Sequence, residues 1–246
     1  MRVFDMIVDE RRRMADLVST LSADQLRTPS LCAGWTVHDV AAHLVTYLRF
    51  GQLKLYAGIV ATAADFDRLN GYLTRREARR PTHEIVDRLR RRAGSRVTIP
   101  RSGYDPVLAD IVLHDLDIRT PLAIPRDVPE DRLWVAFDHL TTKPSPGFAM
   151  GSRLAGLELR ATDAGWSRGS GAPVHGPATS LLLAVGGRSV ALADLTGDGV
   201  PLLRDRTTAP APKPGPLRRL AGPLTVLLRP PPKDRRSRDA VPTVPG

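Results

Sequence analysis

The 246-residue chain contains a single cysteine, Cys32. One thiol cannot form a disulfide within the chain, and it cannot supply the sulfur ligands of a cysteine-based zinc cage. The sequence therefore excludes both a disulfide-stapled fold and a cysteine-rich zinc module. A lone cysteine can be a reactive thiol, but it is more often a small residue of a loop or the core, so we assign Cys32 no nucleophilic role.

The chain also lacks a long apolar run. No stretch reaches the roughly 18 uninterrupted apolar residues that a membrane-spanning helix needs. The first ten residues include Asp5, Asp9 and Glu10, where a secretory signal peptide would be apolar. We therefore expect a cytoplasmic protein with no membrane partner.

Acidic residues are fewer than basic ones, which gives a formal net charge of +10. Residues 205–246 carry +6 of this charge, with nine Lys and Arg against three Asp, and also ten of the 22 prolines. This segment cannot bury enough apolar surface to order itself, so we predict a disordered basic tail. Such a tail can bind nucleic acid or another acidic partner weakly, with strong salt dependence.

The residues before the tail suffice for two modest domains. Apolar positions recur at helical spacing over residues 3–21, residues 59–79 are predicted to be a charged helix, and further helices follow up to Pro121 with short loops between them. Ser22 and Gln25 have the spacing of a capping box, and Thr36 is a plausible N-cap with Asp39 three positions later. Residues 1–124 are therefore predicted to form a bundle of four or five helices.

The pattern changes after Pro125. Residues 156–162 alternate like a strand, and residues 176–186 resemble an apolar helix that ends at two glycines. We predict a small α+β domain over residues 125–204. The expected fold class is α+β: a four-helix bundle, this second domain and the disordered tail.

The strongest candidates for a functional site lie in residues 104–121. Asp110 and His114 are four positions apart, so on a helix they share one face, about 5–6 Å apart at Cβ. They can bind one metal ion together or form a structural hydrogen bond, and the spacing alone favours the hydrogen bond. Asp117, one turn further, would either orient the imidazole or cap the helix end.

His43 is the third candidate. It ends the segment Trp35-Thr-Val-His-Asp-Val-Ala-Ala-His43 and lies on an otherwise apolar face, where a lone histidine is usually a satisfied core residue. That interpretation changes if the fold brings Asp110 and His114 opposite it. Three ligands from two helices leave a fourth position open, as in catalytic zinc sites.

Two longer motifs contain these residues. They are Ser30-Leu-Cys-Ala-Gly-Trp-Thr-Val-His-Asp-Val-Ala-Ala-His-Leu44 and Ala109-Asp-Ile-Val-Leu-His-Asp-Leu-Asp-Ile-Arg-Thr-Pro-Leu122. Together they resemble the mycothiol-dependent maleylpyruvate isomerase family, a branch of the DinB-like metal-binding helix bundles. Residues 156–166, 176–188 and 195–200 are similar to the small sterol-carrier-like domain of that family.

The resemblance implies a divalent metal site, most simply for zinc, with His43, Asp110 and His114 as ligands. The characterised isomerase type has Glu where this chain has the shorter Asp110. The resemblance also implies mycothiol, a low-molecular-weight thiol, as cofactor or co-substrate. A zinc-like ion favours the thiolate form, which is the nucleophile.

Two reactions are consistent with such a site. In a cis-trans isomerase the thiolate adds to an activated double bond and leaves after rotation, whereas in an S-transferase it stays attached to an electrophilic substrate. The ligand residues do not distinguish these reactions. A non-catalytic, metal-retaining binding or regulatory protein that uses the basic tail is the alternative.

Overall fold

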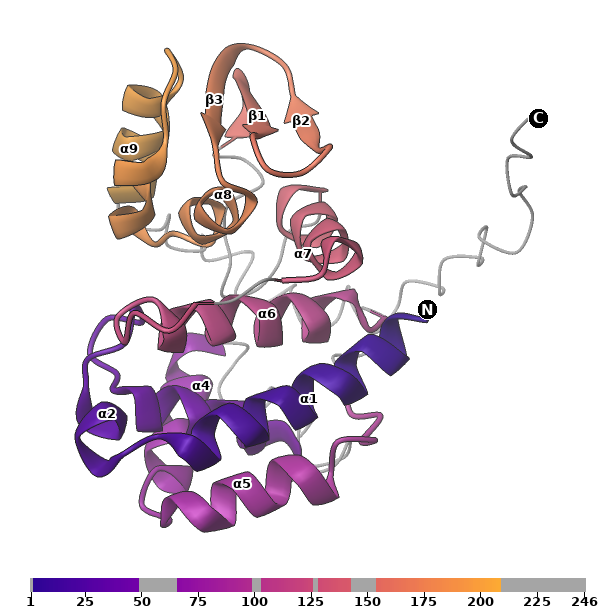
Figure 1. Ribbon diagram of the computed structural model, residues 1–246, viewed down its shortest axis with the longest axis vertical. Helices are drawn as coiled ribbons and strands as arrows, with labels where there is room; N and C mark the ends of the chain where they lie inside the picture. The colour runs from indigo at the N-terminus through magenta and orange to yellow at the C-terminus, as the bar shows by residue number, and fades with distance from the viewer. Residues whose placement is uncertain (1, 49–65, 99–102, 126–127, 143–153, 209–246) are drawn as a thin grey trace, which may run out of the picture.

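The computed structural model describes residues 2–48, 66–98, 103–125, 128–142 and 154–208. They form a helical N-terminal part followed by a small part that combines helices with a three-stranded sheet (Figure 1). The predicted α+β fold class is confirmed at this level. Among the described helices, none combines the length and the apolarity needed to cross a membrane.

The N-terminal part consists of helices. Their bounds are α1 (Val3–Thr20), α2 (Ala23–Arg27), a helix over residues 37–48, α4 (Phe66–Glu77), α5 (Thr82–Arg91) and α6 (Asp105–Arg119). The predicted capping box begins α2, because the Gln25 amide donates to Ser22 Oγ and the Ser22 amide donates to Gln25 Oε1. The helix expected over residues 59–79 is observed over 66–77, and residues 59–65 lie outside the described residues.

The amphipathic pattern of α1 determines how it packs. Met6, Met14 and Val18 are buried, whereas Arg12 and Asp16 on the opposite face are exposed. The buried face contacts α5 and α6, which places α1 alongside both helices in Figure 1.

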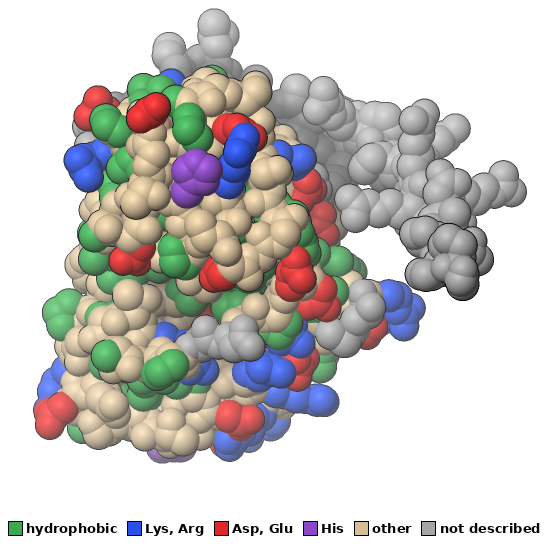
Figure 2. Space-filling model, turned by 45° about the horizontal axis from the view of Figure 1, so that its top comes forward, with side chains coloured by type: hydrophobic (Ala, Val, Ile, Leu, Met, Phe, Trp, Pro, Cys, Tyr) green, Lys and Arg blue, Asp and Glu red, His purple; other side chains and the backbone are tan. Residues whose placement is uncertain are grey.

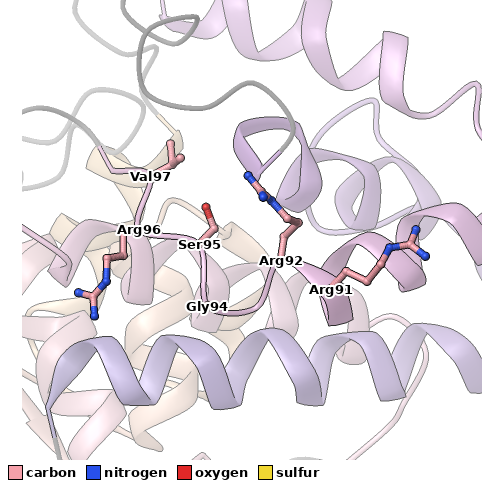
Figure 3. Close-up of a pocket in the computed structure, with 6 residues that line it drawn as sticks. All are labelled: Arg91, Arg92, Gly94, Ser95, Arg96 and Val97. Atoms are coloured by element: carbon pink, nitrogen blue, oxygen red, sulfur yellow. The ribbon is translucent and has the colours of Figure 1, made fainter.

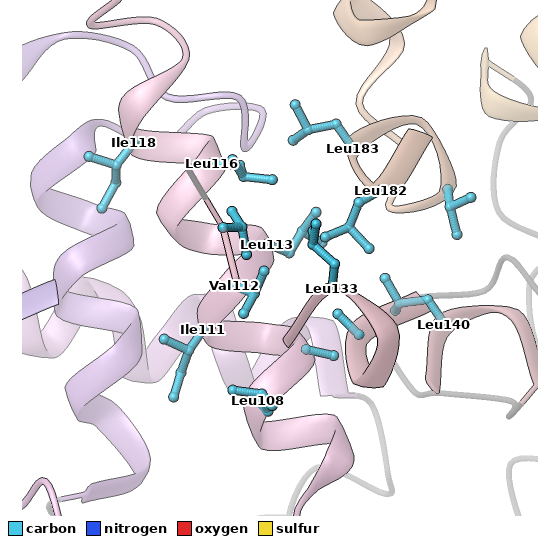
Figure 4. Close-up of a cluster of buried hydrophobic side chains, with 14 of the residues drawn as sticks. Leu108, Ile111, Val112, Leu113, Leu116, Ile118, Leu133, Leu140, Leu182 and Leu183 are labelled. Atoms are coloured by element: carbon cyan, nitrogen blue, oxygen red, sulfur yellow. The ribbon is translucent and has the colours of Figure 1, made fainter. Parts of the chain in front are cut away.

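Helix α6 is apolar on several sides and is buried accordingly. Figure 4 shows Leu113 and Leu116 of α6 on the side of α7 (Glu130–Thr142) and α8 (Ala178–Val185), whereas Ile111 and Ile118 point to the other side of the helix. Its other side packs on α1. Because α6 is held from both directions, any polar group that it carries inward has a fixed position.

The C-terminal part contains the sheet. Its elements are β1 (Leu157–Ala161), β2 (Ser167–Gly169), β3 (Ala172–Gly176), α8, the 3-10 helix η2 (Ser189–Asp194) and α9 (Val200–Thr208). Strand β1 lies in the centre, antiparallel to β2 and parallel to β3. Leu157 and Leu159 are buried in alternation along β1, as the sequence pattern predicted, and α8 packs on β1 and β3.

Helix α9 corrects one boundary. The predicted tail was to begin at residue 205, but α9 continues to Thr208, with Leu203 and Thr207 buried at helical spacing. The burial of these two side chains fixes the last turn of the helix. So short a segment has too few apolar residues for a helical period to be recognised in the sequence. The remainder of the predicted tail, residues 209–246, lies outside the described residues.

The apolar core continues across the predicted domain boundary at residue 124. Phe137 of α7 stacks on Trp166, with ring centroids 4.0 Å apart, and α7 also packs against α6. Acidic and basic side chains are mixed over the face shown in Figure 2, consistent with the modest charge expected of the residues before the tail. The two-domain division itself stays a prediction.

Candidate metal centre

A capped helix start positions His43. The Asp39 amide donates to Thr36 Oγ1 at 3.2 Å, and the Thr36 amide donates to Asp39 Oδ2 at 2.9 Å. This confirms the N-cap predicted at Thr36. The helix then turns His43 inward between Val40 and Leu44, and all three side chains are buried.

The structure brings together the three predicted ligands, His43, Asp110 and His114. His114 Nε2 lies 3.3 Å from Asp110 Oδ1, and His43 Nε2 lies 3.7 Å from the same oxygen. The two imidazole rings meet edge to face with centroids 4.9 Å apart. One ligand atom from each of the three residues lies within 4.8 Å of the others. Metal binding by this set remains a prediction, but the convergence on which it depends is present.

These separations suit a zinc ion. Nitrogen and oxygen ligands about 2.0–2.1 Å from a tetrahedral zinc are themselves roughly 3.3–3.4 Å apart. The two distances to Asp110 Oδ1 are close to that value, so the shorter carboxylate reaches far enough. The Asp110 side chain is 27% exposed while both histidines are buried, which leaves an approach to the site from the Asp110 side.

The electrostatics of the site also favour a cation. Burial would raise the pKa of Asp110, but His114 and His43 outweigh burial and hold that pKa well below its usual range. Burial would lower the pKa of His114, yet Asp110 and Asp117 raise it well above its usual value. Without metal, positive charge on the imidazole is therefore stabilised by two carboxylates, and a divalent ion would benefit from the same field.

Asp117 orients the imidazole of His114, which decides between the two roles considered for it. Its Oδ2 lies 2.8 Å from His114 Nδ1. Arg188 donates to the same carboxylate through Nε and Nη2, at 2.8 and 2.6 Å. With Nδ1 engaged by Asp117, Nε2 is directed toward Asp110 and His43, and on a neutral ring its lone pair would be available to an ion there.

The end of α8 delivers Arg188 to this carboxylate. The Arg188 amide donates to Leu183 O at 2.9 Å and the Gly187 amide donates to Ala184 O at 3.0 Å, which is a Schellman motif. Gly187 has a φ of 89°, a backbone conformation that favours glycine. A Cβ on Gly186 would lie 2.7 Å from a methyl carbon of Leu113 in α6, so the absence of a side chain permits the close approach of α8.

The sequence indicated the glycine stop of α8 but not the role of Arg188. Arg188 is 71 positions from Asp117, and among so many arginines no local pattern distinguishes it. The consequence is that the C-terminal part contributes directly to the candidate site.

Cys32 is the second residue whose place the sequence did not reveal. Its thiol donates to Asp117 Oδ2 at 3.1 Å and lies 3.6 Å from His114 Nδ1. The Leu31 amide donates to the Asp117 carbonyl at 3.2 Å, which fixes the loop against the end of α6. The expectation of a loop position is correct, but the loop belongs to the site.

Cys32, His114 and Asp117 form a second set that could hold a metal ion. In this set Asp117 is already neutralised by Arg188, whose Nη2 also lies 3.4 Å from the Cys32 sulfur. A divalent cation there would have to displace or face a guanidinium. The set of His43, Asp110 and His114 is therefore the better metal site on charge grounds.

Aromatic and hydroxyl side chains surround His43. The Trp35 ring lies 5.3 Å from the His43 ring and the Tyr47 ring lies 6.0 Å away. Burial, together with the nearby Asp110 carboxylate, raises the pKa of Tyr47, so its hydroxyl stays protonated. On its other side, His43 Nδ1 lies 3.3 Å from Thr74 Oγ1.

A separate open hollow of about 540 Å³ follows α5 (Figure 3). It is lined by Arg91, Arg92, Gly94, Ser95, Arg96 and Val97. Arg91 pairs with Asp87, and Arg96 lies over the ring of Phe4. The arginine side chains extend in different directions in Figure 3, so their charges do not converge on one point. This hollow offers weaker chemistry than the histidine cluster.

Comparisons with known proteins give a family for the N-terminal part and a fold for the chain. Residues 7–103 match the family model described as the mycothiol maleylpyruvate isomerase N-terminal domain. That segment contains His43, whereas Asp110 and His114 lie beyond it. No curated protein matches the chain.

Two solved structures match nearly the whole fold. The crystal structure of the mycothiol-dependent maleylpyruvate isomerase aligns with a TM-score of 0.51 at 16% identity. A histidine-to-alanine mutant of that enzyme aligns with a TM-score of 0.50 at 15% identity. Each alignment covers 87% of this chain and 99% of the other. Residues 7–103 therefore belong to the mycothiol maleylpyruvate isomerase N-terminal domain family, within a chain that has the overall fold of the solved isomerase.

Proposed function

We propose that this protein is a divalent-metal enzyme, most simply a zinc enzyme, that uses a small thiol of the mycothiol type. Its reaction would be the cis-trans isomerisation of an activated double bond, as in maleylpyruvate, or the transfer of the thiol to an electrophile. The observation that carries the proposal is the convergence of His43, Asp110 and His114 on one point. The family match and the shared fold support it.

The residues of the site have distinct tasks. His43, Asp110 and His114 would hold the ion, which when bound would favour the thiolate form of the thiol. Asp117 orients His114 through Nδ1, and Arg188 neutralises Asp117. Asp110 is the partly exposed member of the set, so a thiol would approach the ion from the Asp110 side.

Both candidate reactions begin with the same attack. The thiolate forms a C–S bond to the substrate while an electron pair moves onto a conjugated carbonyl or a leaving group. In isomerisation the adduct rotates about the C–C bond that was the double bond, and the electron pair then returns to restore the double bond and expel the thiolate. In S-transfer the C–S bond persists and the leaving group departs.

Metal content tests the ligand set. Zinc-loaded wild-type protein, freed of excess metal, is expected to retain one ion per chain. His43→Ala and His114→Ala should lose most of it, because two protein ligands hold a divalent ion much less tightly than three. His83 on α5 is exposed, so His83→Ala is the matched control and should retain the ion. Full retention by both ligand variants would contradict the proposal.

Activity assays separate the two reactions. Zinc-loaded protein is mixed with mycothiol and either maleylpyruvate or an alkylating electrophile, and products are followed by NMR. Isomerisation without net thiol loss identifies an isomerase, whereas stoichiometric thiol loss identifies an S-transferase. Neither reaction, with metal retained, would favour the non-catalytic alternative. A chain ending after Thr208 keeps α9 and tests whether residues 209–246 bind nucleic acid or an acidic partner.

A further inference from the structure

The two ring nitrogens of His43 face different partners. Nε2 points toward Asp110, at 3.7 Å from Oδ1, and Nδ1 lies 3.3 Å from the hydroxyl of Thr74. Thr74 is 1% exposed and His43 4%, so bulk water does not compete for this contact. Because a neutral imidazole has one donor nitrogen and one acceptor nitrogen, the partner at Nδ1 influences the state of Nε2.

Helix α4 holds Thr74 in register with the helix of residues 37–48. One turn from the pair of His43 and Thr74, the Tyr47 hydroxyl donates to Asn70 Oδ1. The paired positions increase along one helix and decrease along the other, so the two helices run antiparallel. At the far end His38 Nε2 lies 3.1 Å from Ala78 O, at the C-terminal side of α4. Three polar contacts therefore fix α4 against the helix that carries His43.

We propose that Thr74 is a positioning residue for His43: when Nε2 binds the metal, the hydroxyl of Thr74 accepts from Nδ1–H and holds the ring with the Nε2 lone pair toward the ion. This inference rests on the proposed metal site. The two histidines then differ in the partner of Nδ1: His114 has a charged carboxylate there, whereas His43 has a neutral hydroxyl. Partners of this kind are commonly worth 10–100-fold in metal affinity, and a neutral one belongs at the lower end.

A second buried threonine provides a matched control. Thr46 lies on the same helix as His43 and is fully buried, but its hydroxyl donates to Ala42 O of its own helix at 3.1 Å. Thr46→Val removes a buried hydroxyl without touching the ring of His43. Thr74→Val makes the same chemical change at the Nδ1 contact, and Thr74→Ser retains the hydroxyl.

Zinc affinity, measured by competition with a chromophoric chelator, tests the proposal in full-length protein. Thr74→Val is expected to bind zinc about tenfold more weakly than wild type. Thr74→Ser and Thr46→Val should stay within about twofold of wild type. Equal affinity in wild type and Thr74→Val would overturn the proposal, and so would an equal loss in Thr46→Val, which would reveal a general effect of removing buried hydroxyls.

Nitrogen-15 NMR of the imidazole rings provides a readout that does not need metal. The Nδ1 resonance of His43 should move in metal-free Thr74→Val and stay in place in Thr46→Val. If wild-type protein binds no zinc, the proposed function fails, and this shift alone judges the role of Thr74. An unmoved Nδ1 resonance in Thr74→Val would refute that role.

Discussion

Replacing Arg188 with methionine leaves the carboxylate of Asp117 buried without its cation. Arg188 donates two hydrogen bonds to Asp117, at 2.8 and 2.6 Å, and the two side chains are 12% and 0% exposed. Methionine keeps an unbranched apolar stem of similar length. The substitution therefore removes charge and hydrogen bonds with little change in packing.

The expected loss of stability follows from the burial of this pair. Removing one partner of a buried ion pair typically costs about 3–5 kcal/mol, because the other charge stays desolvated. His114 still hydrogen-bonds Asp117 in the variant, so we expect the lower end, about 3 kcal/mol. The free energy of unfolding of a single domain is only about 5–15 kcal/mol, so a change of this size is large enough to measure.

The sign of the pH dependence follows from the pKa of Asp117. Burial would raise that pKa, but hydrogen bonds from His114 and Arg188 hold it below its usual range. A carboxyl group with a depressed pKa stabilises the fold above its unfolded pKa of about 3.9 and loses this contribution as the pH falls through the folded value. The penalty in Arg188→Met is therefore expected to be full at neutral pH and to shrink in acid.

Urea unfolding of metal-free protein at pH 7, followed by circular dichroism, measures the effect. Arg90→Met is the control, because Arg90 pairs with Asp16 on the surface with side chains 49% and 72% exposed. That pair should contribute less than about 1 kcal/mol. Asp117→Asn combined with Arg188→Met should recover much of the loss. A loss in Arg188→Met no larger than in Arg90→Met would refute the reasoning.

Three further predictions concern other parts of the molecule. Gly186→Ala should cost about 1–3 kcal/mol in urea unfolding, because its Cβ would meet Leu113 in the core, whereas Gly94→Ala, with nothing within 4 Å, should be nearly neutral. Asp9→Asn should cost less than about 1 kcal/mol at pH 6, because the 42% exposed carboxylate pairs with two arginines. Burial would raise the pKa of Asp9 but the two arginines lower it, so this cost should shrink as the pH falls below about 3.9; a constant cost would count against the ion pairs. Asp110→Glu should weaken zinc binding in chelator competition, because the aspartate oxygen is already at coordination range and an extra methylene must fold back; tighter binding would contradict this geometry.

The sequence predicted the parts of the fold that depend on local signals. The caps at Ser22 and Thr36 and the glycine stop after α8 are decided within a few residues, so their spacing is readable. The last turn of α9 was missed because its order depends on tertiary contacts of Leu203 and Thr207.

The candidate site was predictable only in part. Spacing suggested the pair of Asp110 and His114, but the family resemblance was needed to join His43 to it. Arg188 and Cys32 were missed because each reaches the site across many tens of residues, and neither belongs to a periodic pattern. Which side chains contact the candidate ligands depends on how distant elements pack together, and a single sequence does not reveal that packing.

The two-glycine turn after α8 has a consequence for how proteins with this fold can diverge. Because that turn carries Arg188 to Asp117, a substitution in the turn can change how Asp117 supports His114 while every candidate ligand stays in place. The segment that matches the family model, residues 7–103, does not contain this turn. It also lacks two of the three candidate ligands, Asp110 and His114. Chains that share only that segment can therefore inherit the scaffold and evolve different metal chemistry, or none.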